Sequence, residues 1–167
     1  MDAGVVVVGA GFAGFWAAVA ARRVGGPALP ITLVAPTPAL VVRPRLYEAH
    51  PESLAVNLSG LLERLDVGFV ADTATGVDPE GLRLEFTSRP VLPFERLVVA
   101  TGSVMRRPPV AGADHAFSID TQLDAQRFDR RLAAELSGSG SSIRLARDPP
   151  RSRPGAVASV VVPRLSR

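Results

Sequence analysis

Short apolar runs, each closed by glycine, proline or polar residues, divide the N-terminal part of the chain. Such runs are typical of strands buried on both faces of a sheet. They predict four strands: Val5–Val8, Ile31–Val34, Val67–Ala71 and Leu97–Ala100. Between these runs the apolar residues follow helical spacing, which predicts one helix from Phe12 and another over Leu58–Leu65. Alternating strands and helices predict a parallel sheet with the first strand at its centre.

A cluster of shorter β runs interrupts this alternation. The runs are Ala74–Val77, Leu82–Phe86 and Val91–Leu92, and the sequences between them, Asp78-Pro79-Glu80-Gly81 and Ser88-Arg89-Pro90, are typical of turns. They predict a small antiparallel meander that leads back to the main sheet. The expected fold class is therefore α/β with three layers, made of helices, a parallel sheet and the meander.

Two further segments complete the predicted domain. Residues 42–48 are too rich in proline for a strand and too apolar for a free loop, so they predict an ordered, buried loop. An amphipathic helix is predicted over Thr121–Leu136, with an apolar face made of Leu123, Phe128, Leu132 and Leu136. From Ser137 the composition changes to Ser, Gly, Arg and Pro. We expect one domain over residues 1–136 and a largely disordered tail over residues 137–167.

The turn after the first strand carries the clearest chemical signal. Gly9, Gly11 and Gly14 form a G-x-G-x-x-G pattern between a strand and an apolar helix, an arrangement that holds the pyrophosphate of a dinucleotide. Gly9 lets the chain turn off the strand, Gly11 lets the backbone approach a phosphate, and Gly14 lets the helix pack closely on the strand. The helix N-terminus then directs N–H groups at the phosphates. A glycine-rich turn that holds no ligand is the alternative.

The ends of two other strands bear on the same site. Ala100 leads into Thr101-Gly102, small residues that leave room for a cofactor beside the glycines, although alone a Thr-Gly ending is typical of an ordinary turn. The second strand ends at Ala35, where the dinucleotide fingerprint has an acidic residue that holds the ribose. This departure weakens a simple NAD-dehydrogenase interpretation. It leaves open whether backbone groups or Thr37 replace the acid.

Composition excludes several kinds of chemistry. The chain has no cysteine, which excludes disulfides, thiolate metal sites and redox chemistry through a Cys pair. Two histidines are too few for a multi-histidine metal centre. We therefore expect no metal site.

Charge and hydropathy limit the partners and the location. The net charge is +3, but residues 137–167 hold six Arg and one Asp, so residues 1–136 are slightly acidic and no nucleic-acid partner is expected. All nineteen basic residues are Arg, which indicates a GC-rich, bacterial source. Three glycines and Arg22-Arg23 interrupt the apolar N-terminal run, which excludes a signal peptide or a membrane span. We expect a cytoplasmic protein, with peripheral membrane contact as the alternative; no oligomeric state is indicated.

Taken in order along the chain, these features resemble a known family. The glycine pattern, the loop Arg43-Pro44-Arg45-Leu46-Tyr47-Glu48, the β-meander and the strand ending Ala100-Thr101-Gly102 are similar to FAD-dependent pyridine nucleotide oxidoreductases, above all to the type II NADH dehydrogenase-like branch. The resemblance covers about residues 4–136 and implies a Rossmann-like FAD/NAD(P)-binding domain. It also implies FAD as cofactor and NAD(P)H as co-substrate, with hydride passing through FAD to a small-molecule acceptor such as a quinone.

The resemblance implies roles for individual residues as well. The residues near FAD would be Gly9, Ala10, Gly11, Phe12, Ala13, Gly14, Arg43, Ala100, Thr101 and Gly102. The loop from Arg43 to Tyr47 would lie towards the flavin ring. An ordinary surface ion pair is the alternative for Arg43 and Arg45, and Tyr47 is expected in the core. The resemblance identifies no catalytic residue in this chain.

The family pattern is incomplete in this sequence. A second βαβ unit with its own glycine fingerprint for NAD(P)H, a returning FAD segment with Gly-Asp, and a C-terminal interface domain are absent from the 167 residues. Gly138–Ser142 follows no strand and therefore cannot be the second fingerprint. We expect a truncated or frame-shifted product that is inactive alone. Two alternatives remain: a nucleotide-binding module without turnover, and a subunit completed by a partner chain.

Overall fold

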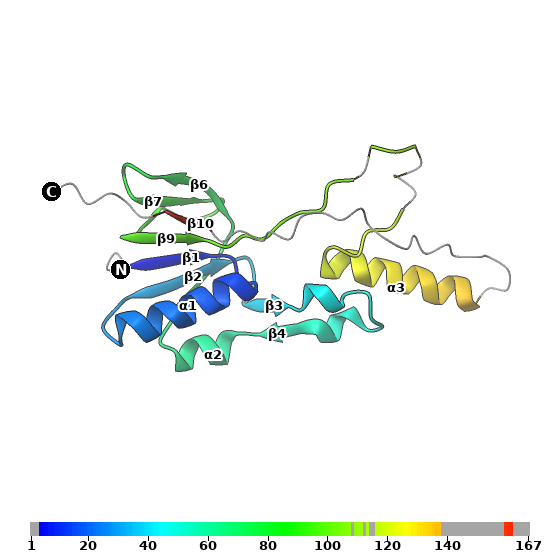
Figure 1. Ribbon diagram of the computed structural model, residues 1–167, viewed down its shortest axis with the longest axis horizontal. Helices are drawn as coiled ribbons and strands as arrows, with labels where there is room; N and C mark the ends of the chain where they lie inside the picture. Colours follow the sequence, from blue (N-terminus) through cyan, green and yellow to red (C-terminus); the bar gives the residue numbers. More distant parts are fainter. Residues whose placement is uncertain (1–3, 108, 112, 114–115, 138–158, 162–167) are drawn as a thin grey trace. The chain divides into compact units, whose positions relative to one another are not determined.

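The chain divides into two compact units. The computed structural model describes residues 4–107, 109–111, 113, 116–137 and 159–161 (Figure 1). The first unit is made of Met1–Leu40, Asn57–Gly102 and Ala156–Arg167, and the second of Val41–Val56 and Ser103–Gly155. The predicted boundary at residue 136 stays a prediction, because residues 138–158 lie outside the described part of the chain.

A parallel sheet forms the centre of the first unit. Its parallel strands are β1 (Val5–Val8), β2 (Ile31–Ala35), β5 (Gly68–Ala71) and β9 (Arg96–Val99), and the order across the sheet is β10-β9-β1-β2-β5. Val6 in β1 lies opposite Thr32 on one side and Leu97 on the other. The prediction that the first strand is central is confirmed.

One edge of this sheet is closed by a strand that the sequence did not predict. β10 (Ser159–Val161) pairs antiparallel with β9, with Val160 opposite Val98. The main-chain groups of an open strand edge can hold a short segment that has no core of its own. The rest of the predicted tail after Ser137 lies outside the described residues.

Two helices belong to the first unit. α1 (Phe12–Gly25) packs against β1 and β2 through its buried Gly14 and Ala18, whose small size permits a close approach. α1 ends where Gly26 takes a positive φ of 71° and donates its N–H to the Arg22 carbonyl. At the start of α2 (Ser59–Arg64), the side-chain oxygen of Asn57 accepts the N–H of Ser59 at 2.8 Å.

The predicted meander covers the face of the sheet opposite α1 (Figure 1). It is made of β6 (Ala74–Asp78), β7 (Arg83–Phe86) and β8 (Leu92–Pro93), all antiparallel. Leu84 of β7 is fully buried in one cluster with Val6 and Val8. Because side chains alternate along a strand, Val5 and Val7 point to the face that carries α1. Helices, sheet and meander form the three layers that the sequence predicts.

The second unit is built from short elements around a small core. β3 (Ala39–Val41) and β4 (Ala55–Asn57) form a two-stranded sheet that leads into and out of it. Between them lie two 3₁₀ turns, η1 (Arg43–Arg45) and η2 (Pro51–Leu54), and the later helix α3 (Gln122–Ser137) packs on η2. Leu46, Leu54 and Ala125 form the core of this unit.

Two predictions about this core are wrong. Tyr47, expected in the core, is 71% exposed, whereas its neighbour Leu46 is 3% exposed. Leu123, expected on the packed face of α3, is 53% exposed, and Ala125 is buried instead. The face of α3 that packs on η2 carries Ala125, which clusters with Leu46 and Leu54.

Candidate functional site

The candidate site begins with residues 9–14, which we call the glycine turn. Its first residue, Gly9, must be glycine. Gly9 continues β1 by donating its N–H to the Val34 carbonyl at 2.8 Å, and its φ is +110°. A Cβ at this position would stand 2.2 Å from the Ala100 carbonyl oxygen. Both the backbone conformation and the neighbouring strand end therefore exclude a side chain.

Gly14 is required for a different reason. A Cβ there would stand 1.8 Å from the Gly9 carbonyl oxygen and 3.5 Å from the Ala100 Cβ. The helix thus lies directly on the turn that precedes it. The predicted roles of Gly9 in turning the chain and of Gly14 in close packing are confirmed.

Gly11 has no such constraint within the chain. Its backbone is in an ordinary extended conformation (φ −72°, ψ −175°), and a Cβ would meet no atom within 4 Å. Nothing in the described protein requires glycine at this position. The free space beside Gly11 is where a bound group could approach the backbone.

The N-terminus of α1 opens onto the same turn. No side chain caps the helix, and its first turn contains no acidic residue. The first N–H groups of a helix lack intrahelical partners and carry the positive end of the helix dipole. This end of α1 is therefore suited to an anionic group such as a phosphate.

The end of β9 lies beside the glycine turn, as the sequence predicts. Ala100 donates its N–H to the Val8 carbonyl at 2.8 Å and is itself buried. Thr101 and Gly102 follow it and are exposed, and Gly102 has a positive φ of 79°. Only small residues border the turn on this side.

The end of β2 carries no acid. Ala35 is buried, and its carbonyl accepts the N–H of Asp72 at 3.2 Å. The carboxylate of Asp72, a residue that sequence reasoning missed, is already occupied: it accepts the Thr73 N–H at 2.7 Å and the Ser88 hydroxyl at 2.9 Å. Burial alone would raise the pKa of Asp72, but these hydrogen bonds and the charge of Arg89 together lower it. Asp72 thus joins β5 to the meander.

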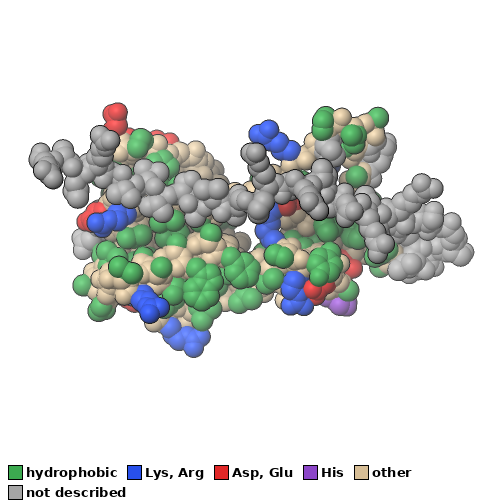
Figure 2. Space-filling model, viewed as in Figure 1, with side chains coloured by type: hydrophobic (Ala, Val, Ile, Leu, Met, Phe, Trp, Pro, Cys, Tyr) green, Lys and Arg blue, Asp and Glu red, His purple; other side chains and the backbone are tan. Residues whose placement is uncertain are grey.

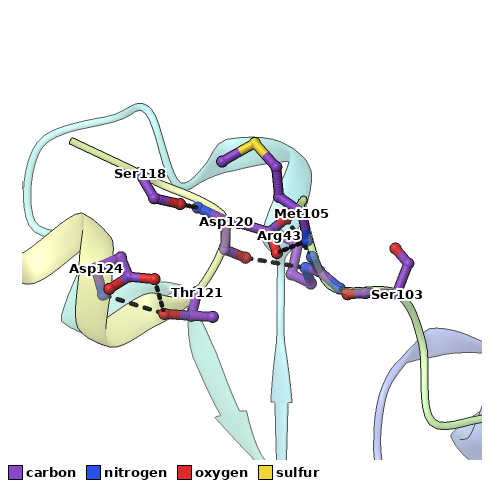
Figure 3. A network of polar contacts seen from close by, with 7 residues as sticks. All are labelled: Arg43, Ser103, Met105, Ser118, Asp120, Thr121 and Asp124. Carbon is purple, nitrogen blue, oxygen red and sulfur yellow. Dashed lines mark hydrogen bonds and ion pairs between the residues drawn. The ribbon is translucent and has the colours of Figure 1, made fainter. Parts of the chain in front are cut away.

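Arg43 lies in the second unit, in a network of polar contacts (Figure 3). Its Nε donates to the Asp120 carbonyl at 3.1 Å, its Nη1 donates to the Ser103 carbonyl at 2.9 Å, and its Nη2 pairs with the Asp120 carboxylate. Arg45 makes a separate pair with Glu48, with two N···O distances of 2.7 Å. The ion pairs considered as the alternative for both arginines are present.

An apolar surface lies over α1 (Figure 2). Phe12 and Trp16 of this helix are 49% and 60% exposed, and Trp16 meets Phe15 edge to face with ring centroids 5.6 Å apart. Within the described ranges, no helix combines the length and the apolar composition needed to cross a bilayer.

Comparison with known proteins shows the family of this chain. A family model described as pyridine nucleotide-disulphide oxidoreductase matches residues 3–143. The chain belongs to this family. The disulphide of that description has no counterpart within these 167 residues, which contain no cysteine.

Relatives within the family extend well beyond this chain. Two NADH dehydrogenase-like proteins of Mycobacterium tuberculosis are 34% and 33% identical to it over 141 residues. The alignments cover 80% of this chain and 35% of each relative. The chain therefore spans about a third of the length of the relatives it matches.

Solved structures have the same fold. The sulfide:quinone oxidoreductase of Aquifex aeolicus superposes with a TM-score of 0.71 at 24% identity, over 83% of this chain and 33% of that one. A ferredoxin reductase of Rhodopseudomonas palustris gives a TM-score of 0.67 at 25% identity, over 80% of this chain and 35% of that one. The Rossmann-like oxidoreductase fold is thus confirmed for this member of the family.

Proposed function

We propose that this chain is the FAD-binding part of a flavin-dependent NAD(P)H oxidoreductase. The cofactor's pyrophosphate would lie against Gly9, Ala10, Gly11, Phe12, Ala13 and Gly14, with Ala100, Thr101 and Gly102 beside it. The observation that supports this most is the contrast among the glycines. Gly9 and Gly14 are required by the chain itself, whereas Gly11 faces free space beside an uncapped helix N-terminus.

The residues of the turn fit such a group. Backbone N–H groups at the start of α1 can hold phosphate oxygens without a cationic side chain. The small residues Ala10 and Ala100 keep the approach clear of bulky groups. Held there, FAD would supply redox chemistry, by which the electrons of a hydride from a reduced nicotinamide could reach an acceptor, here proposed to be a quinone. The likeness to NADH dehydrogenase-like proteins supports a nicotinamide as the hydride donor.

We propose that the chain alone does not turn over NAD(P)H. One glycine turn of this kind holds one dinucleotide, and the sequence has no second strand-turn-helix with the same pattern. The nicotinamide would have to be held against the flavin by residues outside this chain. A nucleotide-binding module without turnover, or a subunit completed by a partner chain, would have the same glycine turn.

A titration of the purified chain with FAD tests the proposal, read by quenching of flavin fluorescence. We expect saturable binding by the natural chain. Gly11→Val should weaken it at least about tenfold, equivalent to about 1.4 kcal/mol, because the added methyl groups fill the space that the phosphate needs.

The matched control is Gly60→Val. A Cβ at Gly60 also meets nothing within 4 Å, and its φ is likewise not in the left-handed region, but it lies in α2. It should leave FAD binding unchanged. Equal loss in both variants, or no binding by the natural chain, would contradict the assignment.

A further inference from the structure

The segment that leaves the Thr101-Gly102 turn has no core of its own. Residues 101–107 are all exposed, so no buried side chain fixes their path. Gly102 has a positive φ, and as a glycine it lacks the Cβ that would restrict the backbone direction at this point. Polar contacts to the backbone must therefore hold the segment.

Asp120 provides those contacts together with Arg43 (Figure 3). The Arg43 guanidinium binds the carbonyl of Ser103, the residue directly after Gly102, and one oxygen of the Asp120 carboxylate. The other carboxylate oxygen accepts the N–H of Met105 at 3.0 Å. Each residue of the pair thus binds the backbone of the exposed segment as well as its partner.

Asp120 is itself held in place at the start of α3. Its N–H donates to the Ser118 hydroxyl at 3.1 Å. The next residue, Thr121, accepts the Asp124 N–H at 3.1 Å and donates to the Asp124 carboxylate at 2.8 Å, which fixes the first turn of the helix. The pair is thereby anchored to a regular element.

These contacts leave Arg43 poorly suited to bind a phosphate. Three of its five N–H groups already donate within this network. Its charge is matched by the Asp120 carboxylate, and its side chain is only partly exposed. To bind a phosphate, Arg43 would have to give up its charge-assisted hydrogen bond to the Asp120 carboxylate.

We infer that Arg43 and Asp120 are positioning residues that hold the chain after Gly102 for the cofactor, and that Arg43 is not a phosphate ligand. This inference rests on the proposed binding of FAD. It differs from what the family resemblance implies for Arg43, a place near FAD on the loop towards the flavin ring. As a cofactor ligand rather than a positioning residue, Arg43 would most readily bind a phosphate through its charge. The two roles predict opposite behaviour for the Asp120→Asn variant.

The test compares FAD affinity in Arg43→Gln, Asp120→Asn and the double variant. Asparagine keeps the shape of Asp120, but one of its two polar side-chain groups is an NH₂ donor instead of an acceptor. That NH₂ group would face another donor, either the Arg43 guanidinium or the Met105 N–H. If the pair positions the segment, each single variant should lose at least about fivefold in affinity, the lower range of couplings between linked sites. The double variant should lose no more than the worse single variant.

A phosphate-binding Arg43 gives another result. Arg43→Gln would then weaken binding, while Asp120→Asn would release the guanidinium and leave FAD affinity unchanged or higher. That outcome would overturn the inference. Arg45→Gln is the control, because it breaks an arginine–carboxylate pair of the same chemistry within the η1 region, and it should leave affinity unchanged.

Limited trypsin digestion separates this inference from the proposed function, because it needs no cofactor. Arg106 lies in the exposed segment, and cleavage after it reports how often the segment leaves its place. Both Arg43→Gln and Asp120→Asn should release the fragment ending at Arg106 several times faster than Arg45→Gln does. Equal rates would overturn the inference. A third result is faster release of the Arg106 fragment in both variants together with no FAD binding by the natural chain. That result would refute the proposed function, and the positioning of a cofactor would be refuted with it.

Discussion

Gly14 lies so close to Gly9 that a Cβ at position 14 would stand 1.8 Å from the Gly9 carbonyl oxygen. The contact is between backbone atoms, so no side-chain rotation can relieve it. It fixes the distance between α1 and the end of β1. Any residue larger than glycine at position 14 must move the helix or the turn.

We therefore expect Gly14→Ala to destabilise the first unit. Overpacking of this kind costs about 1–3 kcal/mol of the free energy of unfolding. Urea denaturation followed by circular dichroism measures the change, with Gly60→Ala as the control in open space. A Gly14→Ala protein as stable as the natural chain would mean that α1 is not held against the turn.

Arg22 and Arg23 should differ sharply although they are neighbours. The Arg22 guanidinium donates to main-chain carbonyls on two sides, including Leu65 at 2.8 Å and Leu29 at 2.9 Å. Arg22→Gln should lower the free energy of unfolding by about 1.5–3 kcal/mol, because the remaining carbonyls lose a charged donor. Arg23 is exposed, and Arg23→Gln should change stability by less than about 0.5 kcal/mol. Chemical denaturation of both variants provides the comparison.

Asp72 should make stability depend on pH in the acid range. Its pKa in the folded protein is lowered from the ordinary value of 3.8. Its contribution to the free energy of unfolding is therefore present above that value and is lost as pH falls through the folded pKa. Asp72→Asn removes the ionisable group and should be less stable than the natural chain at pH 7. Thermal melts should show that the difference in Tm between the natural chain and Asp72→Asn becomes smaller below about pH 4. A difference in Tm that stays constant from pH 7 to pH 3 would contradict this role.

Leu46 and Tyr47 form a matched test of the second unit. Leu46 is buried against Leu54 and Ala125, so Leu46→Ala should cost about 2–5 kcal/mol through the cavity it leaves. Tyr47→Ala removes a larger but exposed side chain and should change stability by about 0.5 kcal/mol or less. Chemical denaturation of both variants measures the free energy of unfolding and tests whether Leu46, rather than Tyr47, is the core residue. The reverse order would restore the expectation that Tyr47 is the core residue.

Activity provides the last prediction. With added FAD and a soluble quinone, this chain should oxidise NADH no faster than free FAD does. Positioning the nicotinamide against the flavin contributes on the order of 7–11 kcal/mol, and one glycine turn cannot hold both nucleotides. Steady-state NADH consumption is the measurement. Turnover well above the free-cofactor background would place a nicotinamide site within these residues.

The sequence predicts the sheet well because its strands are read from apolar runs. Val5–Val8 is apolar at every position, and only a central strand buries both faces. The glycine turn is equally readable, since Gly14 is dictated by its contact with nearby Gly9 and Gly9 by its own positive φ, although the Ala100 carbonyl that also excludes a side chain at Gly9 is far away in sequence. Local chemistry and burial pattern agree in this part of the chain.

Long-range polar contacts could not be predicted in the same way. Arg22 reaches a carbonyl 43 positions away, and Ser88 reaches Asp72 over 16 positions. Nothing in the identity of an arginine or an aspartate states which backbone group it will meet. The face of α3 was missed for a related reason, because Ala125 packs against Leu46 and Leu54, which are far from it in sequence.

The second unit is made from two stretches of chain separated by Asn57–Gly102 of the first. Arg43 and Asp120, which meet within it, are 77 positions apart. Closing so long a loop costs entropy, and folding slows when contacts join distant positions. A folded first unit shortens the freely moving chain between these stretches. We therefore expect the two units to form in order, with the small core around Leu46 assembling last and opening first.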